Sequence, residues 1–534
     1  MWGSLGKPRR RNPTAFHRTN QPIVSEADRP HSRRPRMLPT SRMRLAMRTT
    51  LVVPLCFLTG FMLIDPVWAQ LPQREERPID LPTALRLAHV DNPEIRLARE
   101  RVREALAYRQ LAAAQFLPSL NVGTNYNQHL GPLQPANGEL VKVNRDSLYL
   151  GLGAGAVGAG TVNIPGVVWS ANLSDVWHTA LIRRQVVRQR AFESDAVRNE
   201  MLLRVASAYL ELLRSAGRQA VATQIRADAA EVARVTKNFA DKGQGRKADA
   251  DRAAVELAQR NSDVVQADND FAVASARLGQ LLSLDPVVRL VPMERQVVPA
   301  ALVPEPIPLP ELLAIALTQR PELGERQVAI RASLLQLRNA KLLPFSPQVL
   351  IGYSAGTFGG GSDRLAAGAV QPNGTILQQP RFGSFSDRED FDVVLFWSLR
   401  NLGVGNLALI RVSQSQLRQS ELRSLEMLNR VRAEVATSQS RVLARYAQIE
   451  IHEKAIASSQ TAFKEDLVRT RNNIGLPIEV LDSLRLLGRS KYAYLDAIVD
   501  YNRAQFELYV ALGQPPADVL SRPVPLNASE PRTK

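Results

Sequence analysis

Three glycines in an uncharged stretch have the spacing of a nucleotide-binding loop. Gly153, Gly155 and Gly158 spell G-x-G-x-x-G within Ser147–Ser174, which holds no charged residue. Such a loop cradles a pyrophosphate only where a strand precedes it and a helix begins at its last glycine. Here residues 161–165 follow without a helical pattern and end in a proline. The spacing therefore does not predict a nucleotide site.

The same stretch is long enough for a membrane-spanning helix, which needs roughly 20 apolar residues. Its composition argues against one, because each glycine costs about 1 kcal/mol relative to alanine inside a helix. Pro165 also removes a backbone donor. The stretch is therefore predicted to be a flexible glycine-rich loop that leads into a strand.

Other reactive side chains are few and scattered. Cys56 is the only cysteine, and it lies in an apolar segment with the pattern of a signal peptide. His89, His129, His178 and His452 stand singly, without the spacing of metal ligands. The sequence offers no paired nucleophile and base. It predicts a protein that is not an enzyme and that binds no cofactor or metal.

The basic excess of the chain is concentrated at its start. Residues 1–50 hold twelve Lys or Arg and two acidic residues, so they supply +10 of the formal charge of +17. The remainder is only weakly basic, and we expect no nucleic-acid partner.

An export signal follows this basic segment. "MRLAMRTT" is a basic region, "LVVPLCFLTGFML" an apolar one, and "VWA" a small-residue cleavage pattern before Gln70. Residues 1–69 are thus predicted to be a leader and signal peptide. Because a signal peptide normally begins at the N-terminus, we expect true initiation at Met37, Met43 or Met47.

The rest of the chain contains an internal sequence repeat. Three pairs of similar segments recur at nearly one offset, and a proline-rich segment lies between the two copies. The pairs are 80–98 with 308–326, 167–173 with 395–401, and 271–286 with 501–516. We therefore predict a tandem duplication, with repeats at 79–297 and 308–516 and a flexible tail at 517–534.

Each repeat is predicted to be mainly helical. Apolar residues three and four apart indicate a first helical stretch, then a very long helix, then a return helix. The first stretches cover about 82–116 and 310–342, and the long helices about 175–241 and 402–473. At 1.5 Å per residue each long helix spans roughly 100 Å.

Two strands per repeat interrupt the helices. Residues 119–127 and 348–355 alternate with a period of two, and so do 167–173 and 391–399. The connections at about 128–166 and 357–390 are expected to be long loops. Four strands cannot close a barrel, so the chain must oligomerise to avoid unpaired edges in lipid. In such a barrel the aromatic residues expected near the membrane interfaces are Tyr126, Trp169, Tyr353 and Trp397.

These features resemble a known family. The signal peptide, the duplication, the strand pairs and the closing "GLPIEVLDSLRLLGRSKYAYLDAIVDYNRAQFELYVALG" of residues 475–513 look like the TolC-like outer membrane factors. The resemblance implies a mainly α fold with a membrane β-barrel part, in which four strands per subunit join an oligomeric barrel and long helical hairpins form a periplasmic tube. It also implies a homotrimer in outer membrane lipid. The implied function is the passive channel of a tripartite efflux pump or type I secretion system, working with a periplasmic adaptor protein and an inner-membrane transporter.

The resemblance also suggests a candidate gate. Glu479 and Asp482 follow the turn at Gly475, and the matching acidic positions line the periplasmic aperture in the family. An alternative stays open, because carboxylates in the first turns of a helix stabilise it by about 0.3–1 kcal/mol through the helix dipole. Asp482 is the stronger candidate, since it lies farther from the helix start.

One other class of function stays open. A periplasmic structural or adaptor coiled coil would explain the helices but would leave the four alternating strands unexplained. Within the channel class, the sequence does not indicate the transported substrate.

Overall fold

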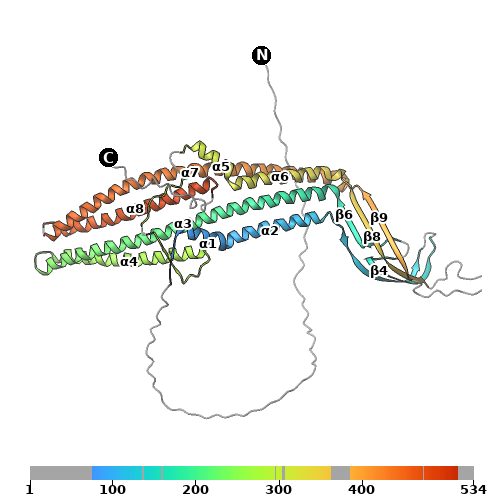
Figure 1. Ribbon diagram of the computed structural model, residues 1–534, viewed down its shortest axis with the longest axis horizontal. Helices are drawn as coiled ribbons and strands as arrows, with labels where there is room; N and C mark the ends of the chain where they lie inside the picture. The colour runs from blue at the N-terminus through green and yellow to red at the C-terminus, as the bar shows by residue number, and fades with distance from the viewer. Residues whose placement is uncertain are drawn as a thin grey trace, which may run out of the picture. The chain divides into compact units, whose positions relative to one another are not determined.

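Long helices lead into a mostly antiparallel sheet in the described part of the chain (Figure 1). The computed structural model describes residues 75–134, 138–157, 160–294, 296–303, 307–362, 385–472 and 474–514. All of them fall in one unit, Pro72–Lys534. The expected leader at 1–69 and tail at 517–534 lie outside the described residues. The mainly helical fold class is confirmed.

Each predicted first helical stretch is divided in two by a proline. In the first, Asn92 caps the second helix by accepting from the backbone N–H of Glu94 at 2.9 Å, and Pro93 begins that helix without a donor to satisfy. Pro321 begins the corresponding helix of the second repeat. The helices are α1 (Leu81–Asp91), α2 (Pro93–Ala114), α5 (Leu309–Gln319) and α6 (Pro321–Leu342).

The two predicted long helices and their return helices are present. They form one hairpin, α3 (Leu173–Asp241) with α4 (Lys247–Leu281), and a second, α7 (Val404–Arg471) with α8 (Pro477–Ala511). Their lengths match closely between the halves: 69 and 68 residues for the long helices, and 35 for each return helix. Gly243, at φ +71, lies in the first reversal, where a left-handed backbone favours glycine.

Apolar side chains hold the two hairpins together. Ile225 and Val232 of α3 pack in one buried cluster with Phe463 of α7 and Leu484 of α8. Near the middle of α3, Gly217 lets α8 approach closely, because a Cβ there would lie 2.8 Å from a methyl carbon of Leu495. The hairpins therefore meet mainly along the seam between α3 and α8.

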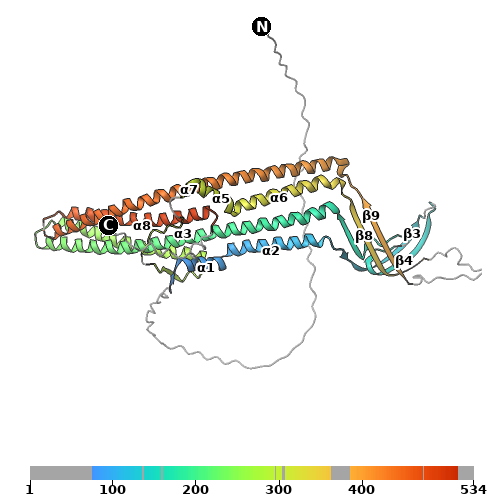
Figure 2. The ribbon, with the colours of Figure 1, turned by 45° about the horizontal axis from the view of Figure 1, so that its top comes forward.

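Nearer the sheet, four helices lie side by side in the order α2, α3, α6, α7 (Figure 2). The short turns η1 (Leu343–Phe345) and η2 (Arg400–Gly403) join α6 and α7 to their strands. The sheet thus begins where this four-helix layer ends.

Seven of the described strands form the sheet, and among them it does not close. Strand β8 is central: it pairs with β9 on one side, and with β6 and then β4 on the other. β2 pairs with β6, and β3 pairs with β4. The bounds are β2 (Ser119–Leu120), β3 (Val122–Leu133), β4 (Val141–Ala154), β5 (Ile164–Pro165), β6 (Val167–Asn172), β8 (Gln348–Ser362) and β9 (Ser386–Phe396). Among the described strands, β9 and β2/β3 are left as open edges.

The prediction of loops at 128–166 and 357–390 was wrong in part. The hairpin of β3 and β4 occupies much of the first segment, and β8 and β9 extend into both ends of the second. The glycine-rich stretch is therefore partly a strand rather than a flexible loop. The physical reason is close packing, since a Cβ on Gly151 would lie 2.5 Å from the carbonyl oxygen of Ala355 and from Cα of Gly356. Glycine lets β4 and β8 pair where larger residues would collide.

A small parallel sheet was not predicted. β1 (Glu76–Ile79) pairs with β7 (Arg289–Pro292) beside α3 and α4. Ser275 Oγ accepts from the backbone N–H of Leu290 at 2.7 Å and fixes β7 on α4. Four-residue strands that pair across the first half of the chain give no periodic signal in the sequence.

Candidate functional site

One face of the sheet is apolar and exposed. Residues directly opposite on paired strands point to the same face, so Ile351 shares a face with its partners Trp169 and Val393. Tyr353 and its partner Phe391 continue this face. The side chains most exposed on it include Val122 at 73%, Leu130 at 78% and Phe391 at 69%. An apolar surface of this extent marks contact with lipid or with another protein.

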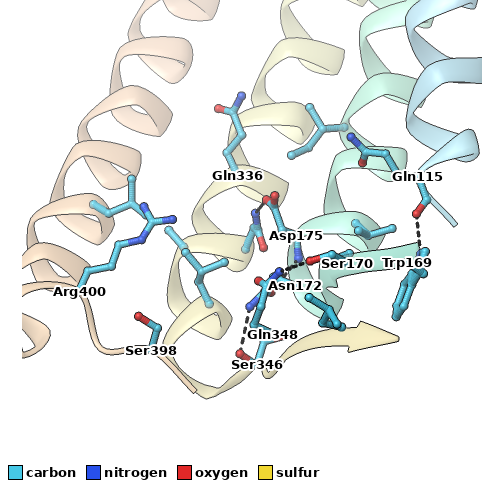
Figure 3. Close-up of a pocket in the computed structure, with 18 of the residues that line it drawn as sticks. Gln115, Trp169, Ser170, Asn172, Asp175, Gln336, Ser346, Gln348, Ser398 and Arg400 are labelled. Carbon is cyan, nitrogen blue, oxygen red and sulfur yellow. Dashed lines mark hydrogen bonds between the residues drawn. The ribbon is translucent and has the colours of Figure 1, made fainter. Parts of the chain in front are cut away.

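The opposite face opens on a cavity of about 1200 Å³ where the strands meet the helices (Figure 3). All four helices of the layer line it, together with residues 168–172 of β6 and the alternate residues Gln348 and Leu350 of β8. Its walls carry many amide and hydroxyl groups. Asp175 and Arg400 are the only charged residues in the lining. The cavity is therefore polar but nearly neutral.

A hydrogen-bond network fixes the strands to the helices at this cavity. Asn172 caps α3 by accepting from Asp175 N at 3.2 Å, and its amide donates to Ser346 O at 3.0 Å. Ser174 Oγ donates to Asn339 Oδ1 at 2.9 Å, and the Asn339 amide donates to Asp175 Oδ1 at 2.9 Å. The start of α3 is thereby tied to α6 and to the turn before β8, as Figure 3 shows in part.

Trp169 and Trp397 occupy the same position in the paired segments 167–173 and 395–401, and they make equivalent contacts. Trp169 Nε1 donates to Gln115 O at 2.8 Å, and Trp397 Nε1 donates to Phe345 O at 3.2 Å. Trp169 lies in β6 and Trp397 directly follows β9, so each indole joins its part of the sheet to the end of the preceding helical segment. Both lie at the end of the sheet next to the helices.

Two ion pairs join the hairpins near the ends of the helices farthest from the sheet. Glu256 of α4 is 4% exposed and accepts from Arg485 of α8 at 2.8 Å and from Arg260 at 2.6 Å. Burial opposes the charge of Glu256, but the two guanidinium groups outweigh it and hold its pKa below the usual value. Sequence reasoning missed this cluster, because its carboxylate and one partner lie on different hairpins.

The second pair links the long helices. Glu231 of α3 accepts from Arg471 of α7 at 3.0 Å and from Arg234 at 2.7 Å. The hydrogen bond from Arg234, with that from Arg471, lowers the pKa of Glu231 to about 2. Both carboxylates are therefore ionised at neutral pH.

The candidate gate residues lie at the start of α8, each with its own partner. Glu479 is in the first turn, and its Oε2 accepts from the backbone N–H of Leu476 at 3.3 Å. Asp482 is 66% exposed and pairs with Arg485 at 3.5 Å. The contact of Glu479 agrees with the helix-stabilising interpretation, whereas Asp482 presents its carboxylate to solvent.

Comparison with solved structures identifies the architecture. The chain is similar to the outer-membrane channel OprN, with a TM-score of 0.65 and 19% identity over 81% of this chain and 89% of that one. The chain has the TolC-like fold. This fold is shared with the outer membrane protein VceC from Vibrio cholerae, with a TM-score of 0.63 and 14% identity over 81% of this chain and 96% of that one. It is also shared with the Campylobacter jejuni CmeC outer membrane channel, with a TM-score of 0.63 and 12% identity over 81% of this chain and 85% of that one. No family model and no curated protein matches the sequence.

None of the helices in the described residues combines the length and apolar character needed to cross a membrane. In the same ranges, no group of three or more His, Cys, Asp or Glu side chains is arranged to hold a metal ion.

Proposed function

We propose that the chain is one subunit of an outer-membrane channel that serves as a passive conduit from the periplasm to the exterior. The observation that carries this proposal is the two-sided sheet. One face is apolar and exposed, the other opens on a polar cavity, and both continue directly into the four-helix layer. Lipid on one side and an aqueous pore on the other account for this arrangement.

The open edges of the sheet support oligomerisation, which we propose gives a homotrimer. The free edges of β9 and β2/β3 would leave backbone groups unpaired in lipid. Pairing of β9 with the β2/β3 edge of another copy would satisfy them and close a barrel. The number of three copies comes from the resemblance to the TolC-like family.

A tandem duplication is part of the proposal. The matched lengths of α3 and α7, and of α4 and α8, support it, as do the equivalent contacts of Trp169 and Trp397. The repeats at 79–297 and 308–516 would then each supply one hairpin and half of the strands.

The helical end away from the sheet would reach through the periplasm toward an adaptor protein and an inner-membrane transporter. The turns that join α3 to α4 and α7 to α8 lie at this end (Figure 1). Glu479 and Asp482 would line the aperture there. An efflux pump and a type I secretion system would use the same conduit.

The alternative function, a periplasmic structural or adaptor coiled coil, is less well supported. It accounts for the hairpins but gives no role to the exposed apolar residues of the sheet, such as Val122, Leu130 and Phe391.

Fractionation and conductance separate the two functions. The full chain is expressed in a Gram-negative host, and the outer membrane is extracted and analysed on gels with and without heating. We expect a heat-dissociable oligomer in the outer membrane that conducts in planar bilayers. A chain recovered from the soluble periplasm, without conductance, would support the coiled-coil alternative instead. An epitope at Gly138 tests orientation, since the β3–β4 connection should be reachable on intact cells. A second epitope, at Gly374 in the loop predicted at about 357–390, should be reachable as well; this position lies outside the described residues.

A further inference from the structure

Six basic residues lie on one side of the four-helix layer, just beyond the sheet. We infer that this basic collar binds the anionic headgroups of phospholipids in the leaflet next to the helices. The inference rests on the proposed membrane insertion of the sheet. The collar consists of Arg109 of α2, Arg184 of α3, Arg338 and Lys341 of α6, and Arg411 and Arg418 of α7.

The collar points away from the cavity. Successive residues of an α-helix are about 100° apart, so residues two apart point about 160° from each other. Each collar residue lies two positions from a residue that lines the cavity: Arg338 from Gln336, for example, and Arg411 from Leu409. All six side chains are exposed. The collar therefore lies on the same side of the molecule as the apolar face of the sheet.

The collar charges are not paired within the described part of the chain. None of the six makes an ion pair or hydrogen bond through its side chain with any residue that the structure describes. The four helix segments that carry them, 102–116, 173–191, 329–345 and 404–420, hold eleven Lys or Arg and two acidic residues. Of those two, Asp175 lines the cavity. Glu104 lies two turns from the cavity-lining Leu111 and so faces the same way.

Exposed apolar side chains separate the collar from the strands. Trp177, Leu342 and Leu407 each lie two positions from a cavity-lining residue, so they face outward with the collar. They are 60%, 49% and 58% exposed. Phe116, 47% exposed, follows the last turn of α2. On every helix of the layer, the apolar residue is closer to the sheet than the cations are.

This order matches the depth profile of a bilayer leaflet. The apolar sheet face would lie in hydrocarbon, the aromatic and large aliphatic side chains at the interface, and the cations at the level of the phosphates. A polyanionic cell-wall polymer would also attract the cations, but it offers nothing to the exposed indole of Trp177 or to Leu342 and Leu407. The continuous apolar-to-basic order therefore favours anionic phospholipid.

The test compares two variants of the full chain that remove equal charge from exposed, unpaired cations. One loses part of the collar; the matched control loses cations far from the sheet. The collar variant is Arg184→Gln, Arg338→Gln, Lys341→Gln and Arg411→Gln. The control is Arg226→Gln, Lys237→Gln, Lys242→Gln and Lys464→Gln.

Each purified oligomer is equilibrated in detergent micelles with equimolar phosphatidylglycerol and phosphatidylethanolamine, and its retained lipids are measured by mass spectrometry. We expect the wild type and the control to retain an excess of phosphatidylglycerol. In the collar variant the enrichment of phosphatidylglycerol should fall by roughly threefold or more. Raising the salt should weaken the wild-type enrichment, because exposed charges are screened. Equal enrichment in the collar variant, or none in the wild type, would overturn the inference.

If the enrichment is not found, two further measurements show whether membrane insertion or the lipid assignment is wrong. Flotation with lipid vesicles tests insertion alone: a wild type that does not float overturns the proposed function and the collar together, whereas one that floats without enrichment overturns only the collar. Sedimentation with purified peptidoglycan tests the other polyanion. If the collar variant loses peptidoglycan binding and keeps its phosphatidylglycerol, the collar binds the wall and the lipid assignment is wrong.

Discussion

At the residue scale, two glycines decide how closely β4 and β8 pair. A Cβ on Gly151 would lie 2.5 Å from Ala355 O, and one on Gly356 would lie 2.6 Å from Leu150 O. We predict that Gly151→Ala destabilises the protein by about 1–3 kcal/mol, because the backbones must separate to admit the methyl group. Chemical unfolding of the purified variant measures this. Gly160→Ala is the control, since a Cβ there meets nothing within 4 Å, and equal stability of both variants would contradict the prediction.

The faces of the strands could be predicted from the sequence, but their close approach could not. Alternation with a period of two placed Val122, Tyr126 and Ile351 on one face, and the pairing in the sheet agrees. That signal is local. The contact of Gly151 with Gly356 joins strands from different halves of the chain, and a run of glycines by itself is equally typical of a flexible loop.

At the element scale, the linker between the two halves is held on α8 by buried amides. Gln505 is fully buried, and its Oε1 accepts from the backbone N–H groups of Leu302 and Val303 at 3.3 and 3.1 Å. Asn502 accepts from Ala300 N at 2.8 Å in the same way. These side chains replace the partners that a neighbouring strand would supply.

We predict that Gln505→Leu frees this linker. The change leaves the backbone N–H groups of Leu302 and Val303 without this acceptor. The N–H of Val303 is buried, and a buried donor left unsatisfied costs about 1–3 kcal/mol. Limited proteolysis should then cut within residues 296–303 faster than in the wild type. Gln414→Leu, at an exposed position of α7, is the control and should leave the cleavage rate unchanged. A linker equally resistant in the Gln505 variant would show that the amide does not hold it.

The ion pairs between the hairpins should respond to acid. The pKa values of Glu231 and Glu256 lie below the ordinary 4.5, so their ionised forms stabilise the folded state above that pH. This contribution is lost as the pH falls toward the folded-state pKa, about 2 for Glu231. We predict that the ends of the hairpins separate progressively as the pH falls from about 4.5 to about 2.

Spin labels can measure this separation, because the predicted mature chain has no cysteine of its own. Labels at Asp251 and Leu486 report the distance between α4 and α8, and labels at Lys237 and Asp251 give a control within the first hairpin. The distance between hairpins should broaden in acid while the control stays constant. Glu256→Gln should broaden it at every pH. A constant distance down to about pH 2 would assign the ion pairs no role in joining the hairpins.

Helix lengths were well predicted, because long amphipathic runs carry a strong signal. The long helices expected at 175–241 and 402–473 are α3 and α7, with ends shifted by two residues at most. The breaks at Pro93 and Pro321 were missed, since apolar spacing continues on both sides of them. Of the candidate gate, the placement on the first turns of α8 was predicted, but the partner Arg485 and its link to Glu256 were not. Those contacts depend on how the hairpins pack.

At the scale of the whole molecule, an oligomer would repeat every exposed charge around one axis. Asp482 is 66% exposed at the end away from the sheet, so three copies would form a ring of carboxylates there. Glu479 lies one turn earlier and satisfies the start of its own helix. A ring of carboxylates attracts multivalent cations, which can then obstruct the pore.

We therefore predict that replacing Glu479 and Asp482 by Ala weakens block by multivalent cations in single-channel recordings. The blocking concentration should rise by roughly tenfold, since each subunit loses charge at the same constriction. Glu453→Ala with Glu465→Ala removes the same charge from exposed positions of α7 and should leave block unchanged. Asp482→Ala alone should give most of the effect, because Glu479 is engaged with Leu476 N. If a correctly assembled double variant is blocked like the wild type, both carboxylates serve the stability of α8 and the constriction lies elsewhere.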